Sequence, residues 1–69
     1  MSRGSRDTLT GTLRRAGRGY ALETEDGGIW RLDVAPEWNP KARVGCRVTV
    51  EGVRLGSDLL DVHRLYIAS

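Results

Sequence analysis

The sequence of 69 residues predicts an all-β fold, a small barrel of five strands. Apolar residues recur at every second position in most of the chain, which is the period of a strand with one buried face. Short stretches containing glycine separate these segments and are typical of hairpin turns. The one longer connection contains two prolines, which exclude a long regular helix there. Closing the five strands into a barrel removes the exposed edges of a small open sheet.

The first three strands are expected to form an antiparallel meander. The stretches RAGRG, residues 15–19, and EDGG, residues 25–28, join them as tight turns. Gly11 lies in the middle of the first strand, on its inward side, and suits a strand that bends sharply to pair with two neighbours. The inward residues of the three strands are Leu9, Gly11 and Leu13, then Tyr20 and Leu22, then Trp30, Leu32 and Val34.

The segment APEWNPKARVG, residues 35–45, crosses from the meander to the last two strands. Pro36 suits the first position of a single helical turn, and Pro40 then ends that turn. The hairpin turn LGSD, residues 55–58, joins the fourth strand to the fifth. The fourth strand carries its apolar residues on one face, namely Val44, Cys46, Val48 and Val50.

The fifth strand, residues 59–67, breaks the simple alternation of apolar and polar residues. A β-bulge at His63-Arg64 is expected to restore it, because a bulge inserts one extra residue into a strand. The bulge would bring four apolar residues to the same side, namely Leu60, Val62, Leu65 and Ile67.

The core is expected to consist of the residues at the consistent parity of their strands. Tyr20 belongs to this set because it shares a face with Leu22. Cys46 is interpreted as a small buried hydrophobe and not as a nucleophile. The residues predicted to be mostly buried are Leu13, Leu22, Trp30, Leu32, Val48, Val50 and Val62.

Three strands, a connector and two strands is the connectivity of the OB-fold. The segments LTGTLRRAGRGYALETEDGGIWRLDV and VGCRVTVEGVRLGSDLLDVHRL also resemble small bacterial OB-fold-like domains of unknown function. The shared pattern is L-x-G-x-L, dG-x-x-W-x-L, G-x-x-V-x-V-x-G and a closing l-x-V-x-x-I. Its residues here are Leu9, Gly11 and Leu13; Asp26, Gly27, Trp30 and Leu32; Gly45, Val48, Val50 and Gly52; and Leu60, Val62 and Leu65. The connector departs from the pattern, being shorter and richer in proline than the helix of larger OB domains. The resemblance implies a fold and brings no catalytic residues.

The resemblance covers most of the chain after Asp7. Residues 1–7 are therefore expected to form a flexible N-terminus, and residues 8–69 a single OB-like β-barrel domain. No apolar run approaches the ~20 residues that a membrane-spanning helix needs, so no membrane partner is expected. The single cysteine cannot form an internal disulfide, and no cysteine and histidine cluster suggests a metal or cofactor. A cytoplasmic protein is the simplest interpretation.

The stretch LRRAGRGY, residues 13–20, raises the question of nucleic-acid binding. Arginine makes bidentate contacts to phosphate, but exposed arginines are also common on any surface. The favoured interpretation is a hairpin turn with solvated arginines, because the outer face of strands two and three has no stacking aromatic and the flanking loops are short. The alternative assigns phosphate contacts to Arg14, Arg15, Arg18 and Arg31.

Trp38, in the connector, is interpreted as a plug over the open end of the barrel. Its alternative role is an exposed anchor for a partner. Asp58, Asp61 and His63 lie close in sequence, but no residue at suitable spacing completes a catalytic set. The sequence therefore predicts that the protein is not an enzyme. It predicts a non-catalytic binding or interaction module, with an unknown protein partner or a homo-oligomer, and with weak, sequence-tolerant binding of single-stranded nucleic acid as the alternative.

Overall fold

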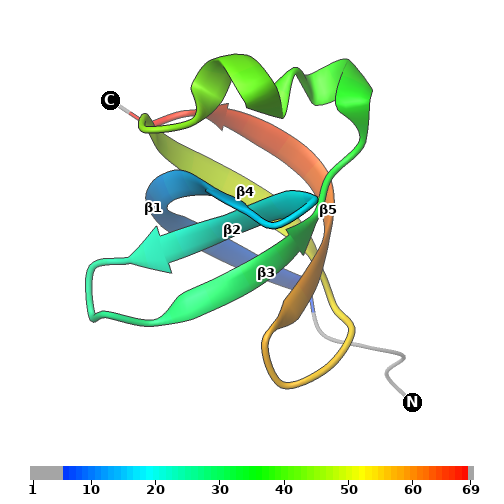
Figure 1. Ribbon diagram of the computed structural model, residues 1–69. Helices are drawn as coiled ribbons and strands as arrows, with labels where there is room; N and C mark the ends of the chain where they lie inside the picture. The colour runs from blue at the N-terminus through cyan, green and yellow to red at the C-terminus, as the bar shows by residue number, and fades with distance from the viewer. Residues whose placement is uncertain (1–5, 69) are drawn as a thin grey trace.

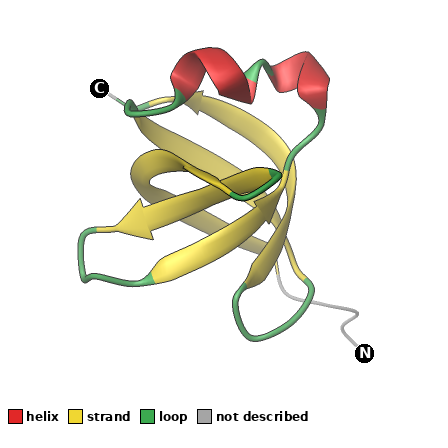
Figure 2. Cartoon of the chain, in the orientation of Figure 1, coloured by secondary structure: helices red, strands yellow, loops and turns green. Residues whose placement is uncertain are grey.

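The computed structural model describes residues 6–68 and contains five strands. Figure 1 shows the five strands curving around one another, with the connector across one end of the barrel. The connector contains two short 3-10 turns, η1 and η2, and it contains no helix longer than these (Figure 2). The elements are β1 (Arg6–Ala16), β2 (Gly19–Thr24), β3 (Ile29–Asp33), η1 (Pro36–Trp38), η2 (Pro40–Arg43), β4 (Arg47–Arg54) and β5 (Leu59–Ile67).

The strands form a closed barrel in the order β1-β2-β3-β5-β4, with β4 pairing back onto β1. All neighbours are antiparallel except β3 and β5, which run parallel. The meander, the connector and the final hairpin are those that the sequence predicts. The fold is therefore all-β, with five strands closed into one small barrel.

The first strand closes the ring because it pairs with two neighbours. Its first half pairs with β4 and its second half with β2, and Gly11 takes part in both ladders. A Cβ at Gly11 would collide with the backbone carbonyl oxygen of Glu23. The expectation that this strand pairs with two neighbours is confirmed, and the close approach of β2 explains why a glycine stands here.

The first strand begins earlier than the sequence suggests. Arg6 and Asp7 were expected to belong to the flexible N-terminus, but they pair with Val53 and Gly52 of β4. The ladder begins three residues before the apolar alternation, which starts only at Leu9. The remainder of that expected terminus, residues 1–5, lies outside the described residues.

The expected bulge in β5 is present. Arg64 pairs with Glu51 while Val62 pairs with Gly52, so His63 is the inserted residue. Leu60, Val62 and Leu65 are buried as predicted. Ile67 lies on the same side as Leu65, as expected, because the two pair with Val48 and Val50, but its side chain is 46% exposed. Ile67 lies at the last rung of the β4–β5 ladder, at the rim of the barrel.

The core sits inside the barrel, and six of the seven residues predicted for it are buried. The seventh, Trp30, is only half-buried and packs against the core from its edge, as Tyr20 does. The prediction that Cys46 is buried is wrong, because this residue is exposed. The fourth strand starts at Arg47, so Cys46 lies in the turn before it, next to Gly45 with its φ of 89°.

No helix within residues 6–68 combines the length and the apolar character needed to cross a bilayer.

Candidate ligand-binding surface

Two hollows meet at Tyr20, near the end of the barrel that the connector covers. The first, of about 360 Å³, is mostly apolar and is lined by Tyr20, Val34, Pro36, Asn39, Pro40 and Lys41. The second, of about 260 Å³, lies beside the β1–β2 turn, and its lining includes Arg18, Tyr20, Arg31 and Leu59. We call these two hollows together the Tyr20 surface.

The apolar hollow owes its shape to the two prolines of the connector. Each proline stands at the start of a 3-10 turn, and Asn39 between them takes a left-handed conformation with a φ of 54°. The backbone N–H of Asn39 donates to the carbonyl of Pro36 at 2.9 Å, which caps the first turn. This double turn holds Pro36 and Pro40 on the same hollow as Tyr20.

The second hollow is shaped by a two-residue turn. Gly17 and Arg18 alone connect β1 to β2, and Gly17 has a φ of 58° that favours glycine. The turn brings Arg18 to the same hollow as Arg31 of β3. Neither arginine takes part in an ion pair among residues 6–68.

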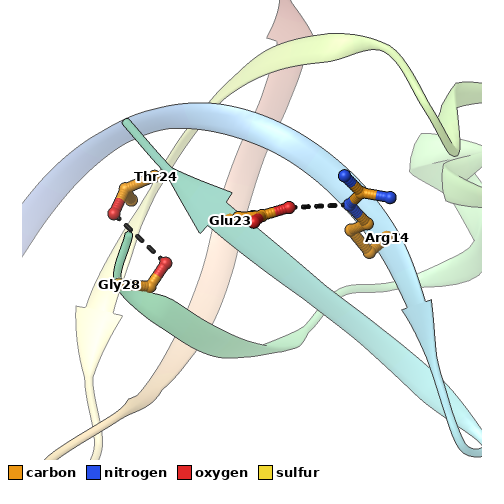
Figure 3. Close-up of polar contacts among 4 residues, drawn as sticks. All are labelled: Arg14, Glu23, Thr24 and Gly28. Carbon is orange, nitrogen blue, oxygen red and sulfur yellow. Dashed lines mark hydrogen bonds and ion pairs between the residues drawn. The ribbon is translucent and has the colours of Figure 1, made fainter. Parts of the chain in front are cut away.

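The other two candidate arginines are already engaged within the chain. Arg14 donates from Nε to Oε1 of Glu23 at 2.9 Å across the β1–β2 pair (Figure 3). The guanidinium of Arg15 lies over the ring of Tyr20, 5.7 Å from its centroid. The structure therefore separates the four arginines that the sequence grouped, with Arg18 and Arg31 at one hollow and Arg14 and Arg15 paired with neighbours.

The outer face of β2 and β3 has the polar character that the sequence predicts. Across the strands, Arg14, Ala21 and Arg31 share one row, and Glu23 shares the next with Ile29. Ile29 is 55% exposed and is the only large apolar side chain among these residues. No aromatic ring stands on this face, because Tyr20 and Trp30 both pack against the core.

Trp38 is half-buried and packs against the core, as a plug would. It lies in η1, where its backbone N–H donates to the carbonyl of Ala35 at 3.1 Å. Its role as a partner-binding anchor stays a prediction.

His63 is exposed, with Nε2 3.3 Å from Oδ2 of Asp61. No group of three or more histidine, cysteine or carboxylate side chains within residues 6–68 has the geometry of a metal site.

Two aromatic contacts lie away from the Tyr20 surface, and the sequence indicated neither. The guanidinium of Arg54 lies over the ring of Trp30, 4.9 Å from its centroid. Tyr66 is 44% exposed, and its hydroxyl donates to Oε2 of Glu51 at 2.8 Å. That hydrogen bond is the first cause of a raised pKa for Tyr66, followed by partial desolvation and the Glu51 charge. The parity of Tyr66, opposite to that of Leu65, is the signal that identifies it as outward-facing.

The β2–β3 turn is held by side-chain hydrogen bonds. The hydroxyl of Thr24 is within hydrogen-bonding distance of the carbonyl of Gly28, at 3.2 Å (Figure 3), and of the carboxylate of Asp26. The backbone N–H of Gly28 also donates to Asp26 at 3.1 Å. These two donors, Thr24 first, lower the pKa of Asp26. These hydrogen bonds give the turn a structural role.

The strands and this surface define a small protein with a closed, five-stranded β-barrel. A family model matches residues 10–66, and the chain belongs to that family, a protein family of unknown function designated DUF5818. The searches of curated proteins and of solved structures return no match. The family supports the sequence-based resemblance to domains of unknown function and assigns no activity to any residue.

Proposed function

We propose that this domain is a non-catalytic binding module, and that its Tyr20 surface binds an extended, acidic segment of a partner protein. The observation that carries the proposal is that an apolar hollow and a basic hollow share the ring of Tyr20. A peptide that places one apolar side chain beside one or two carboxylates matches this arrangement.

The apolar hollow supplies the part of the surface that favours burial of a side chain. Val34, Pro36 and Pro40 form its wall, and Pro40 is itself buried and hence rigidly placed. Half-buried aromatic and proline walls bind an apolar side chain at a low cost in conformational entropy. Lys41 lines the same hollow, so a carboxylate next to that side chain has a cation within the site.

The basic hollow supplies the selection for acidic partners. Arg18 and Arg31 carry two charges that no carboxylate of residues 6–68 pairs with. A guanidinium binds a carboxylate through two parallel hydrogen bonds, which adds orientation to charge attraction. An acidic residue that follows the apolar one along the peptide is expected to bind there.

Single-stranded nucleic acid is the second candidate ligand, favoured by the meeting of Arg18 and Arg31 beside an aromatic ring. Two features support the peptide instead. The guanidinium of Arg15 already lies over the ring of Tyr20, so it competes with a base that would stack there. The turns that flank the binding face of an OB-fold are also short here, with two residues between β1 and β2 and four between β4 and β5.

Selection from a library of random peptides displayed on phage tests the proposal directly. We expect a consensus with one large apolar residue flanked by Asp or Glu. Arg18→Gln and Arg31→Gln should each weaken a selected peptide by about tenfold, the effect of losing one charge-assisted hydrogen-bonded pair. Arg64→Gln, an arginine of β5 that does not line the Tyr20 surface, is the matched control and should bind as the parent chain does.

A selection that yields no consensus, or one rich in Lys and Arg, contradicts the proposal. Fluorescence anisotropy with an oligo-dT strand tests the second candidate. Binding of that strand should weaken with salt at a slope of about 0.7 per phosphate contacted. Tight oligo-dT binding that both Arg18→Gln and Arg31→Gln abolish would make nucleic acid the ligand of the Tyr20 surface.

We also propose that the domain is a bacterial, cytoplasmic OB-fold domain. The single free cysteine and the resemblance described above support this.

A further inference from the structure

A third hollow lies on the outer wall of the barrel, away from Tyr20. It has a volume of about 300 Å³, at the lower end of the range of ligand pockets, and is predominantly polar. Three strands line it, β1 with Arg6 and Thr8, β4 with Glu51, and β5 with His63 and Arg64. We call it the bulge hollow, because two of its five residues belong to the β-bulge of β5.

The bulge creates this hollow by breaking the alternation of β5. In a regular strand, two successive side chains point to opposite faces. The inserted residue His63 has no partner in β4, so His63 and Arg64 are both exposed and line the same hollow. Bulges commonly serve to re-aim a side chain in this way. The start of β1 then completes the hollow, because its pairing with β4 places Arg6 and Thr8 beside Glu51.

The side chains of the bulge hollow favour an anion. Arg6 and Arg64 are exposed and take part in no ion pair among residues 6–68. The one carboxylate, Glu51, already accepts a hydrogen bond from Tyr66, which does not line the hollow. Asp61, which also lies outside the lining, contacts His63 at 3.3 Å. Two guanidinium groups and the Thr8 hydroxyl thus remain as donors to a ligand.

We infer that the bulge hollow binds a phosphate monoester group, held by Arg6 and Arg64. A monoester carries about two negative charges near neutral pH and presents three acceptor oxygens. Two guanidinium forks and a hydroxyl match that number of oxygens, and a fork binds phosphate through parallel hydrogen bonds. A phosphodiester, with one charge and two free oxygens, uses fewer of these donors. The site is independent of the Tyr20 surface and shares no residue with it.

Nuclear magnetic resonance titration of the whole chain with phenyl phosphate, at constant ionic strength, tests this inference. We expect shifts at Arg6, Thr8, His63 and Arg64. Arg6→Gln and Arg64→Gln should each raise the dissociation constant by about tenfold. Arg18→Gln, on the Tyr20 surface, is the matched control and should leave it unchanged. All three positions are exposed, so each variant is expected to fold. The spectrum of each variant checks this directly.

Two further probes separate the sources of a phosphate monoester. Dimethyl phosphate should bind at least about tenfold more weakly, because it has one charge fewer. Phosphatidylcholine vesicles with and without phosphatidic acid show whether a lipid headgroup binds, and Arg64→Gln should weaken any binding that depends on phosphatidic acid by about tenfold. Binding of phenyl phosphate alone identifies a soluble monoester as the ligand, and binding of both identifies the headgroup as a further source.

Three outcomes would overturn the inference. One is the absence of shifts in the bulge hollow. Another is equal binding of phenyl phosphate and dimethyl phosphate. The third is a set of shifts that Arg18→Gln removes and Arg64→Gln preserves, since that result would place the phosphate at the Tyr20 surface. Each outcome is distinct from failure of the peptide selection, which concerns other residues.

Discussion

The Tyr20 surface and the bulge hollow both present two arginines that no carboxylate of residues 6–68 pairs with, but they are built differently. At the Tyr20 surface, a two-residue turn and a proline-rich connector bring side chains together at one end of the barrel. In the bulge hollow, one inserted residue in a strand does so on the outer wall. The densest arginine stretch of the sequence, residues 13–20, contributes only Arg18 as an uncommitted charge. Local pairing, and not the density of arginine, decides where a charge remains for a ligand.

The apolar component also differs between the two sites. The Tyr20 surface has a ring and two prolines beside its cations, whereas the bulge hollow has none among its lining residues. A ligand that buries carbon and carries a carboxylate suits the first site. A compact oxyanion suits the second. The predictions that follow test whether the two sites are as independent as this comparison requires.

The largest expected effect belongs to Gly52→Ala. Gly52 pairs with Val62 at the register shift of the bulge, and a Cβ there would collide with the backbone carbonyl oxygen of Asp61. Overpacking against backbone cannot be relieved by a side-chain rotation, so we expect a loss of about 3 kcal/mol in the free energy of unfolding. Denaturant unfolding followed by circular dichroism measures it.

Gly56→Ala is the matched control, because a Cβ at Gly56 would meet nothing within 4 Å. Its free energy of unfolding should change by less than about 0.5 kcal/mol. If Gly52→Ala is as stable as Gly56→Ala, the bulge is not held in place by the close contact between β4 and β5. The geometry of the bulge hollow would then need another cause.

Tyr20→Leu is expected to have the next largest effect, and on one site only. The substitution keeps an apolar side chain against the core but removes the ring that the two hollows share. Central aromatic anchors commonly contribute about 2 kcal/mol or more, so a selected acidic peptide should bind at least about tenfold more weakly by isothermal calorimetry. Phenyl phosphate binding should not change. A parallel loss of phosphate binding would show that the two sites are coupled.

The sequence predicted the framework of the fold well because alternation and turns are local signals. The bulge at His63-Arg64 was predictable for the same reason, since the parity of the apolar residues changes there. Gly11 was predictable because a glycine at an inward position of a strand commonly marks a sharp bend or the close approach of another backbone. These features depend on residues that are near one another in the chain.

The predictions that differ from the structure concern residues near the ends of the strands. Trp30 and Ile67 have the parity of core residues, yet one is half-buried and the other exposed, because their strands reach the rim there. Cys46 fits the alternation of β4 but lies in the turn that precedes it. The bulge hollow was missed because it needs Arg6, assigned to the terminus, next to residues of β4 and β5. Where the strands begin, end and pair depends on contacts between distant residues, which the alternation of apolar residues alone does not predict.

The alkaline titration of Tyr66 sharpens the description of the wall beside the bulge hollow. The hydrogen bond to Glu51 raises the pKa of Tyr66 above its ordinary value of 10.0. The native chain therefore holds this proton more tightly than the unfolded chain. The stabilisation is fully present below pH 10 and is lost as the pH rises through the higher native pKa. Absorbance of the phenolate, compared between the parent chain and Tyr66→Phe, measures it.

Glu51→Gln serves as the control for this titration. Its amide N–H can donate a hydrogen bond to the phenolate, which the Glu51 carboxylate cannot, and the negative charge is gone, so the pKa of Tyr66 should return toward its ordinary value. Above pH 10, the parent chain should lose more stability than Tyr66→Phe does. A Tyr66 that titrates at or below the ordinary value would show that the hydrogen bond to Glu51 does not persist in solution.

Replacing Arg14, Arg15 and Arg18 together by Ala is expected to have only a small effect on stability. The Arg14–Glu23 pair is exposed, with side chains 60% and 41% accessible, and such pairs contribute about 0.2–1 kcal/mol. The contact of Arg15 with Tyr20 is a surface cation–π interaction of about 0.5–1 kcal/mol. Arg18 takes part in no ion pair among residues 6–68. We therefore expect the free energy of unfolding to fall by about 1 kcal/mol.

The same triple variant decides between the two ligands considered for the Tyr20 surface. If the site binds acidic peptides, neither the parent chain nor the variant should retain an oligonucleotide at physiological salt, and the variant should bind the peptide about tenfold more weakly. Arg18→Ala alone should weaken peptide binding without changing stability, because it removes a charge from the hollow and no ion pair from the fold. If the parent chain retains the oligonucleotide and the variant releases it, single-stranded nucleic acid replaces the acidic peptide. The arginines of residues 13–20 would then act as phosphate contacts despite their partners within the chain.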